Sequence, residues 1–272
     1  MKRAVCNELF GERDFAESMK ILSAVGFAGV ELAPHTLFGD FTGDIGGKLA
    51  EVRRILDGEG LSFAGMHWLL VGPEGLHVTA ADESLRRRSW DHIRRLADMS
   101  GELGGGPMTL GSPDQRASRD GLSADEATRL FSRGLASVGG HVAAAGSRLL
   151  IEALPSEFTD VVNTLAESRE IIDGIASPGI LGMFDFHNTD DESEDWESLI
   201  REHRGYIEHV HLNDVGGTIP RDARPEYRKA FAALDEIGYR DWVSLEIFTI
   251  PEDPARDLRQ VVRFLDAMDS EE

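Results

Sequence analysis

The feature that most constrains the fold of this chain is an eightfold alternation of short apolar runs with longer, amphipathic and charged runs. Such alternation is typical of βα units and a parallel sheet. The expected strands are Arg3–Asn7, Ala28–Leu32, Ser62–His67, Pro107–Leu110, Arg148–Glu152, Gly179–Asp185, Tyr206–Leu212 and Trp242–Ile247. The expected helices are Asp14–Val25, Lys48–Glu59, Asp82–Leu103, Ser123–Ala145, Val161–Ile175, Trp196–His203, Arg224–Ile237 and Asp257–Ala267. Eight units in 272 residues give 34 residues each, close to what a closed (β/α)8 barrel requires.

Turn residues support these boundaries. Glycines such as Gly60 and Gly238 follow a helical run, where a helix C-terminus favours a residue free to adopt positive φ. Ser123 and Glu126 have capping-box spacing at the start of the fourth helix. An open doubly wound sheet would show a glycine-rich phosphate loop after its first strand, and none is present; the glycines of 101–106 precede a strand and indicate a turn. We expect residues 1–272 to form a single α/β domain, a (β/α)8 TIM barrel.

Composition excludes several classes of protein. The net charge of −21 argues against nucleic-acid binding, because such proteins carry a broad basic surface. The single Cys6 excludes an intramolecular disulfide and a Cys-based zinc site, and it fits a reducing compartment. No stretch approaches the ~20 apolar residues of a membrane span, and the first residues lack the apolar core of a signal peptide. We therefore expect a cytoplasmic protein that binds neither nucleic acid nor membrane.

Ionisable residues end four consecutive strands in the second half of the chain. The carboxyl ends of the strands form the active face of a (β/α)8 barrel. These residues, called the strand-end cluster below, are Glu152, Asp185, His211 and Glu246. Each alone could cap a helix or pair with an Arg, but together they would bury negative charge at a high cost in free energy unless a cation neutralises it. Oxygen donors with one imidazole favour Mn²⁺ or Mg²⁺, with Co²⁺ or Zn²⁺ as replacements; we expect one Mn²⁺ ion.

Other ionisable residues lie near the same strand ends. His67 closes the third strand and His187 follows the sixth, so each is expected either to contact a substrate above the metal or to hydrogen-bond to loop backbone. His209 faces the barrel interior two residues before the candidate ligand of its strand. It either supports that ligand from behind or is a buried core histidine, and the second interpretation is favoured. Glu31 and His35 flank the end of the second strand and are weaker candidates.

Several of these segments make the chain similar to a known family. They are Ile151–Pro155, Phe184–His187, His209–Asp214, Phe231–Leu234 and Leu245–Ile247. They resemble the xylose isomerase-like TIM barrel superfamily and, within it, the sugar phosphate isomerase/epimerase group, which contains ketose 3-epimerases, hydroxypyruvate isomerase and inosose dehydratase. The resemblance covers nearly the whole chain. It is specific for the fold and the metal site but not for the substrate.

The resemblance implies roles for individual residues. It maps the family's four metal ligands onto the strand-end cluster and makes its two glutamates the acid/base pair. A metal that chelates the carbonyl and neighbouring hydroxyl oxygens of a keto-sugar lowers the cost of forming an enediolate, and one glutamate on each face can remove a proton and return another. Glu246 is expected to be the base and Glu152 its partner, with the roles reversed for the other epimer. Glu157 matches a family glutamate that supports this chemistry.

The sequence departs from the ketose epimerases after the seventh strand. An ungapped comparison places Gly217 where those enzymes carry an Arg that grips the substrate, and 220–223 in place of their glycine motif. A basic cluster follows, made of Arg221, Arg224, Arg228 and Lys229. One interpretation is an anionic or larger substrate, contacted by Arg221 and by Arg116 of the loop after the fourth strand. The other, slightly favoured, is a solvated helix start whose arginines pair with nearby acids.

The leading hypothesis is a divalent-metal-dependent isomerase or epimerase of a keto-sugar or related polyol, and the resemblance implies a homodimer or homotetramer. Three alternatives remain open. A lyase would use the same enediolate to expel a β-substituent, either as an inosose dehydratase or on a 3-keto-glycoside. An abasic-site endonuclease shares the superfamily and the segment His211–Asp214, but the net charge argues against it. A non-catalytic barrel could act as a binding subunit.

Overall fold

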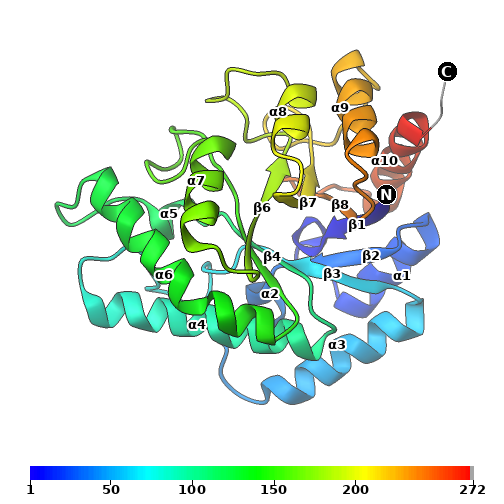
Figure 1. Cartoon of the computed structure of the whole chain (residues 1–272). Helices are drawn as coiled ribbons and strands as arrows, with labels where there is room; N and C mark the ends of the chain where they lie inside the picture. Colours follow the sequence, from blue (N-terminus) through cyan, green and yellow to red (C-terminus); the bar gives the residue numbers. More distant parts are fainter. Residues whose placement is uncertain (270–272) are drawn as a thin grey trace.

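The computed structural model describes residues 1–269 and confirms the expected closed barrel. Eight parallel strands pair in chain order, and the last pairs with the first. The strands are β1 (Lys2–Cys6), β2 (Gly29–Leu32), β3 (Ser62–Met66), β4 (Pro107–Leu110), β5 (Arg148–Ile151), β6 (Ile180–Asp185), β7 (Ile207–Leu212) and β8 (Trp242–Leu245). Figure 1 shows the strands at the centre with the helices around them.

The helices cover the outside of the barrel. They are η1 (Asn7–Phe10), α1 (Phe15–Val25), α2 (Pro34–Phe38), α3 (Ile45–Glu59), α4 (Glu83–Glu102), α5 (Pro113–Arg116), α6 (Ala124–Ala144), α7 (Leu165–Ile175), α8 (Trp196–Glu202), α9 (Pro225–Glu236) and α10 (Pro254–Asp269). The short helices α2 and α5 lie in loops that follow strands and were not expected. Each begins with a proline, whose fixed φ suits the first position of a helix.

The observed boundaries follow local backbone chemistry. The capping box expected at Ser123 and Glu126 is present at the start of α6. The expected start of the fifth helix at Val161 was wrong, because the corresponding helix, α7, begins only at Leu165. Val162 has a φ of 63°, outside the helical region, and the helix is then started by a second capping box between its N-cap Thr164 and Glu167.

The barrel core is apolar except at one end. All four residues of β2 are buried, as expected for strands covered on both faces. The polar exceptions include Glu31, His209 and His211, whose exposed fractions are 0%. Buried ionisable groups persist only where partners compensate them, so these side chains indicate where the barrel is specialised. None of the helices within residues 1–269 is both long and apolar enough to cross a membrane.

A glycine contact between outer helices gives a test of the packing. A Cβ atom on Gly134 of α6 would overlap the indole ring of Trp90 from α4, whose Nε1 donates to the Val78 carbonyl at 3.1 Å. We expect Gly134→Ala to lower the free energy of unfolding by about 1–3 kcal/mol through overpacking. Gly140 of the same helix has no neighbour within 4 Å of its built Cβ, so Gly140→Ala should raise it by up to about 1 kcal/mol. Urea denaturation compares the two variants, and equal effects would contradict this packing.

Candidate active site

The structure brings the strand-end cluster together at the carboxyl ends of β5 to β8. One potential ligand atom from each of its four residues lies within 4.8 Å of every other, and no member is more than 7% exposed. Asp185 and His211 are paired across β6 and β7 in the sheet register. Glu152 and Glu246 directly follow β5 and β8. Four neighbouring strands therefore deliver the cluster, as their spacing in the sequence predicted.

His211 is at the centre of the cluster. Its Nδ1 lies 3.1 Å from Glu246 Oε2, 3.7 Å from Asp185 Oδ2 and 3.9 Å from Glu152 Oε1. Its Nε2 lies 3.2 Å from both carboxylate oxygens of Glu31 on the opposite side. Within residues 1–269 none of these Nδ1 contacts has hydrogen-bond geometry, and the nearest is the ion-pair distance to Glu246. With Nε2 donating to Glu31, Nδ1 faces the three carboxylates as a ligand atom would.

Glu31 supports this arrangement from inside the barrel. It accepts a hydrogen bond of 2.7 Å from His209 Nε2, so His209 is a buried histidine that is linked to His211 through Glu31. Burial would raise the pKa of Glu31, but the two imidazoles hold it well below its usual value. Burial lowers the pKa of His211, yet Glu31 and Glu246 bring it well above its usual value. This raised pKa favours a second proton on the His211 ring, at Nδ1. A cation bound at Nδ1 would take the place of that proton.

The electrostatic environment separates the two glutamates. Burial, reinforced by the charges of Glu246 and Asp185, raises the pKa of Glu152 well above its usual value. Burial also disfavours the charged form of Glu246, but the imidazole of His211 lowers the pKa of this carboxyl below its usual value. Without a metal ion, one glutamate is therefore biased toward the protonated form and the other toward the carboxylate.

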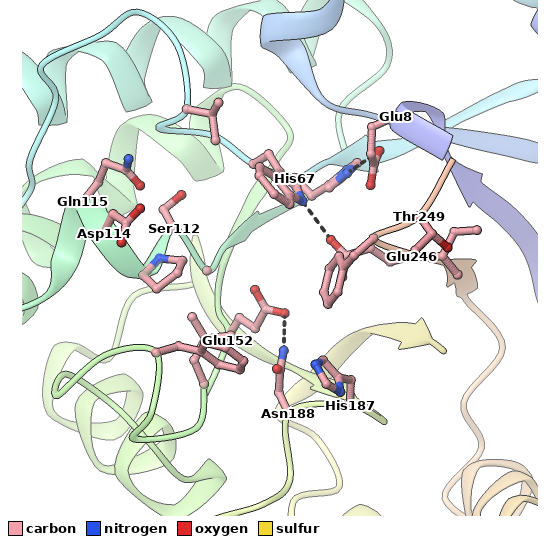
Figure 2. Close-up of a pocket in the computed structure, with 18 of the residues that line it drawn as sticks. Glu8, His67, Ser112, Asp114, Gln115, Glu152, His187, Asn188, Glu246 and Thr249 are labelled. Atoms are coloured by element: carbon pink, nitrogen blue, oxygen red, sulfur yellow. Dashed lines mark hydrogen bonds and ion pairs between the residues drawn. The ribbon is translucent and has the colours of Figure 1, made fainter. Parts of the chain in front are cut away.

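Hydrogen-bond donors fix the orientation of the carboxylates. Asn188 Nδ2 donates to Glu152 Oε1 at 3.0 Å and to Asp185 Oδ2 at 3.1 Å. Trp68 Nε1 donates to Glu246 Oε1 at 3.0 Å. Figure 2 draws the bonds to the two glutamates as dashed lines. The second oxygen of Glu152 fits only because residue 111 is glycine, since a Cβ there would overlap it.

The strand-end cluster fits one divalent metal ion. Three carboxylates and an imidazole form a donor set that suits Mn²⁺, Mg²⁺ or Zn²⁺. Metal–ligand bonds of about 2.0–2.2 Å place donors on opposite sides of one ion about 4 Å apart, which is comparable to the 4.8 Å limit within which these atoms lie. The Nδ1 of buried His211, which faces all three carboxylates, points to the same conclusion.

A cavity of about 630 Å³ opens onto this cluster, within the ~300–1,000 Å³ range of small-molecule sites. Glu152 and Glu246 both line it (Figure 2). His67 and His187 line it too, so the structure places both where sequence analysis expected a substrate contact. His67 Nε2 lies 2.8 Å from a carboxylate oxygen of Glu8, another lining residue.

Three residues that were expected to contact the substrate do not line the cavity: Glu157, Arg116 and Arg221. Glu157 is exposed and does not line it. Arg116 is fully buried and donates to the main-chain carbonyls of Leu110, Glu152 and Val162 at 2.7–3.2 Å, so it supports the backbone of Glu152 and is not directed toward a ligand. Burial lowers the pKa of Arg116 to about 10, which leaves it charged at neutral pH.

The basic cluster after β7 is likewise outside the cavity. Arg221 donates to Gln260 at 2.9 Å and does not line the cavity. Arg224 pairs with Asp214 at 2.6 Å. These contacts agree with the interpretation of a solvated helix start, and the expected anion contact at Arg221 is not supported by its position.

Glu8 and Asn188 are among the polar residues of the site that were not expected from the sequence. Glu8 lies just after β1 and Asn188 lies three residues after the end of β6. Applying the strand-end argument to the first strand as well would have identified Glu8. Asn188 carries no such signal, because an amide in a loop is common and its two hydrogen bonds depend on the fold of that loop.

Comparisons with known proteins agree with the fold and the site. Residues 19–268 match the family described as xylose isomerase-like TIM barrel, and the chain belongs to this family. It is 23% identical over 276 residues to 3-dehydro-D-guloside 4-epimerase of Escherichia coli (strain K12), covering 97% of this chain and 99% of that protein. It is 26% identical over 243 residues to L-ribulose 3-epimerase of Mesorhizobium japonicum, covering 86% and 76%.

Among solved structures, D-psicose 3-epimerase with D-tagatose from Clostridium cellulolyticum H10 superposes with a TM-score of 0.85 at 17% identity, covering 99% of this chain and 98% of that one. That similarity concerns the fold alone. The two sequence relatives are both named epimerases, which supports an enzyme of the isomerase or epimerase type.

The position of Arg116 gives a test of its structural role. Arg116→Met would leave three buried carbonyls without their donor, and each unsatisfied group costs about 1–3 kcal/mol. We expect its free energy of unfolding, measured by urea denaturation, to fall by at least about 3 kcal/mol. The matched change Arg119→Met removes only an exposed ion pair and should cost less than about 1 kcal/mol. Similar losses in both variants would rule out the structural role of Arg116.

Proposed function

We propose that this protein is an epimerase or isomerase of a keto-sugar. It works with one divalent metal ion, which is held by the strand-end cluster and which we expect to be Mn²⁺. The observation that carries the proposal is that Glu152 and Glu246 line one cavity while their carboxylates lie close to His211 Nδ1 and Asp185. The names of the two sequence relatives, both sugar epimerases, support the substrate class.

The residues of the cavity divide the chemistry between them. The bound ion supplies Lewis-acid stabilisation of the enediolate that forms when the carbon next to the carbonyl loses its proton. Glu246 follows β8 and Glu152 follows β5, so the two carboxyl groups reach the substrate from different parts of the barrel rim. We assign Glu246 as the group that takes the proton and Glu152 as the group that returns one from the other face, with the roles reversed for the other epimer.

Neighbouring side chains keep the two glutamates in position for this exchange. Trp68 binds Oε1 of Glu246 and leaves Oε2, the oxygen that faces His211, for the ion or the substrate. Asn188 binds Oε1 of Glu152, the oxygen that faces His211, and so fixes its direction toward the cluster. His67 is buried at the floor of the cavity and held by Glu8, where its ring is suited to bind a sugar hydroxyl. Water exclusion by the enclosing loops would strengthen these interactions.

The acid/base assignment is tested by substitution of each glutamate. In D₂O with Mn²⁺, the wild-type protein should incorporate deuterium at the carbon next to the carbonyl of a keto-sugar, without loss of water or of an aglycone. Glu152→Gln and Glu246→Gln should each lower the exchange rate by about 10²–10⁴-fold. The exposed Glu170 of α7 provides the control, because Glu170→Gln should leave the rate unchanged. Elimination in place of exchange would instead identify a lyase.

Metal binding is tested independently of turnover. Mn²⁺ at about 100 times its dissociation constant should stabilise the folded protein by about 2.7 kcal/mol, seen as a rise in melting temperature that EDTA reverses. His211→Asn should remove most of this rise, because it replaces a central ligand. His141 pairs with Asp98 at an exposed position of α6, so His141→Asn should retain it. An unchanged melting temperature in the wild-type protein would refute the metal site.

A further inference from the structure

The mouth of the cavity carries exposed apolar side chains. Trp68, Phe158, Phe248 and Ile250 all line the cavity, and their exposed fractions are 40%, 43%, 50% and 65%. We call these four residues the apolar rim. Val215 is a further exposed large apolar residue of the described chain, at 79%, and it does not line the cavity. Single exposed apolar residues are common on protein surfaces, whereas a group around one opening marks a binding surface.

The apolar rim is held in place by specific packing. The ring of Phe248 lies so close to Gly217 that a Cβ at position 217 would overlap it, and the Phe248 amide donates to the Gly217 carbonyl at 2.9 Å. The ring of His187 lies 5.5 Å from that of Phe248 and 6.3 Å from that of Phe158. The loops after β5, β6, β7 and β8 therefore support one aromatic wall. The side chain missing at Gly217 is what makes room for it.

Buried polar side chains form the floor of the cavity, and Asp114 and Thr249 add two exposed polar groups to its lining. The floor carries Glu152, Glu246, His67 and Asn188, which can bind the hydroxyl and keto oxygens of a sugar ring. The apolar rim offers a hydrophobic surface that gains free energy when an apolar group covers it. A sugar ring alone would satisfy the floor and leave the rim exposed to water.

The charge of the lining restricts the substrate further. Among the described residues that line the cavity there is no Lys or Arg, whereas four are acidic. Anionic substrates are bound by Arg or Lys, above all through bidentate contacts to phosphate or carboxylate. Arg116 and Arg221, the candidates for such contacts, are engaged elsewhere. The cavity therefore suits a neutral substrate.

We propose that the substrate is a neutral keto-glycoside with an apolar aglycone, which packs against the apolar rim while the keto-sugar ring lies on the polar floor. This inference rests on the proposed function and specifies its substrate class. It agrees with the name of one relative, which refers to a 3-dehydro-D-guloside. A second protein chain is a poorer occupant of the rim, because it would cover the opening through which the substrate enters.

Binding of unreactive glycosides tests the rim separately from the chemistry. In the Mn²⁺-loaded protein, calorimetry should show phenyl β-D-glucopyranoside binding at least about tenfold more tightly than methyl β-D-glucopyranoside, a difference of about 1.4 kcal/mol. Phe158→Ser and Phe248→Ser should each reduce this preference to less than about threefold. Val215→Ser, which alters an exposed apolar residue outside the cavity, should retain it. Equal affinities in the wild-type protein would overturn the inference.

Turnover and assembly provide the remaining checks. The wild-type protein should exchange deuterium into phenyl 3-keto-glucoside with a kcat/KM at least about tenfold that for the methyl analogue. Exchange without this preference would overturn the aglycone site and leave the proposed function intact. A binding preference without any exchange would overturn the proposed function and the keto-glycoside assignment with it.

Glucose 6-phosphate that binds more tightly than glucose would refute a neutral substrate. Dissociation of an oligomer in Phe248→Ser would assign the rim to a contact between copies.

Discussion

The imidazole of His211 lies between Glu31 inside the barrel and the three carboxylates at its open end, and the neighbouring side chains are arranged around this contact. Negative charge this deeply buried destabilises a fold unless it is compensated. Two histidines compensate Glu31 from within. The carboxylates of the strand-end cluster have one imidazole among them, so compensation from inside the protein is incomplete. The same incompleteness that costs stability would favour a bound cation, as the proposed function requires.

The site separates reactivity from recognition. The reactive carboxyl groups directly follow strands, where the sheet holds their backbone, and donors such as Asn188 fix their oxygens. Recognition falls to loops, whose residues can change without altering the sheet. Phe248 depends on both a strand and a loop. It closely follows β8, and its position is fixed by contact with the loop of Gly217. Under the proposed function, the contact between these two loops therefore contributes to the choice of substrate.

The strand-end cluster was predictable from sequence because successive parallel strands end at one edge of the sheet, so the last residue of each strand must lie near the others. Arg116 was not. Its position in the loop after the fourth strand suggested a substrate contact, whereas the turn of α5 directs the guanidinium to main-chain carbonyls that include that of Glu152. The start of α7 was missed for a similar reason, since the positive φ of Val162 arises from the fold of its loop. The apolar rim depends on contacts between loops that no local pattern records.

Closure of the sheet has a consequence for how the protein acquires activity. β8 pairs with β7 on one side and with β1 on the other, and Glu246 follows its last residue. The strand that completes the ring thus also delivers the final carboxylate. A chain still emerging from the ribosome, or one cut short before Trp242, holds neither a closed sheet nor a full set of ligands. Under the proposed function, closure of the sheet and completion of the reactive site therefore depend on the same strand.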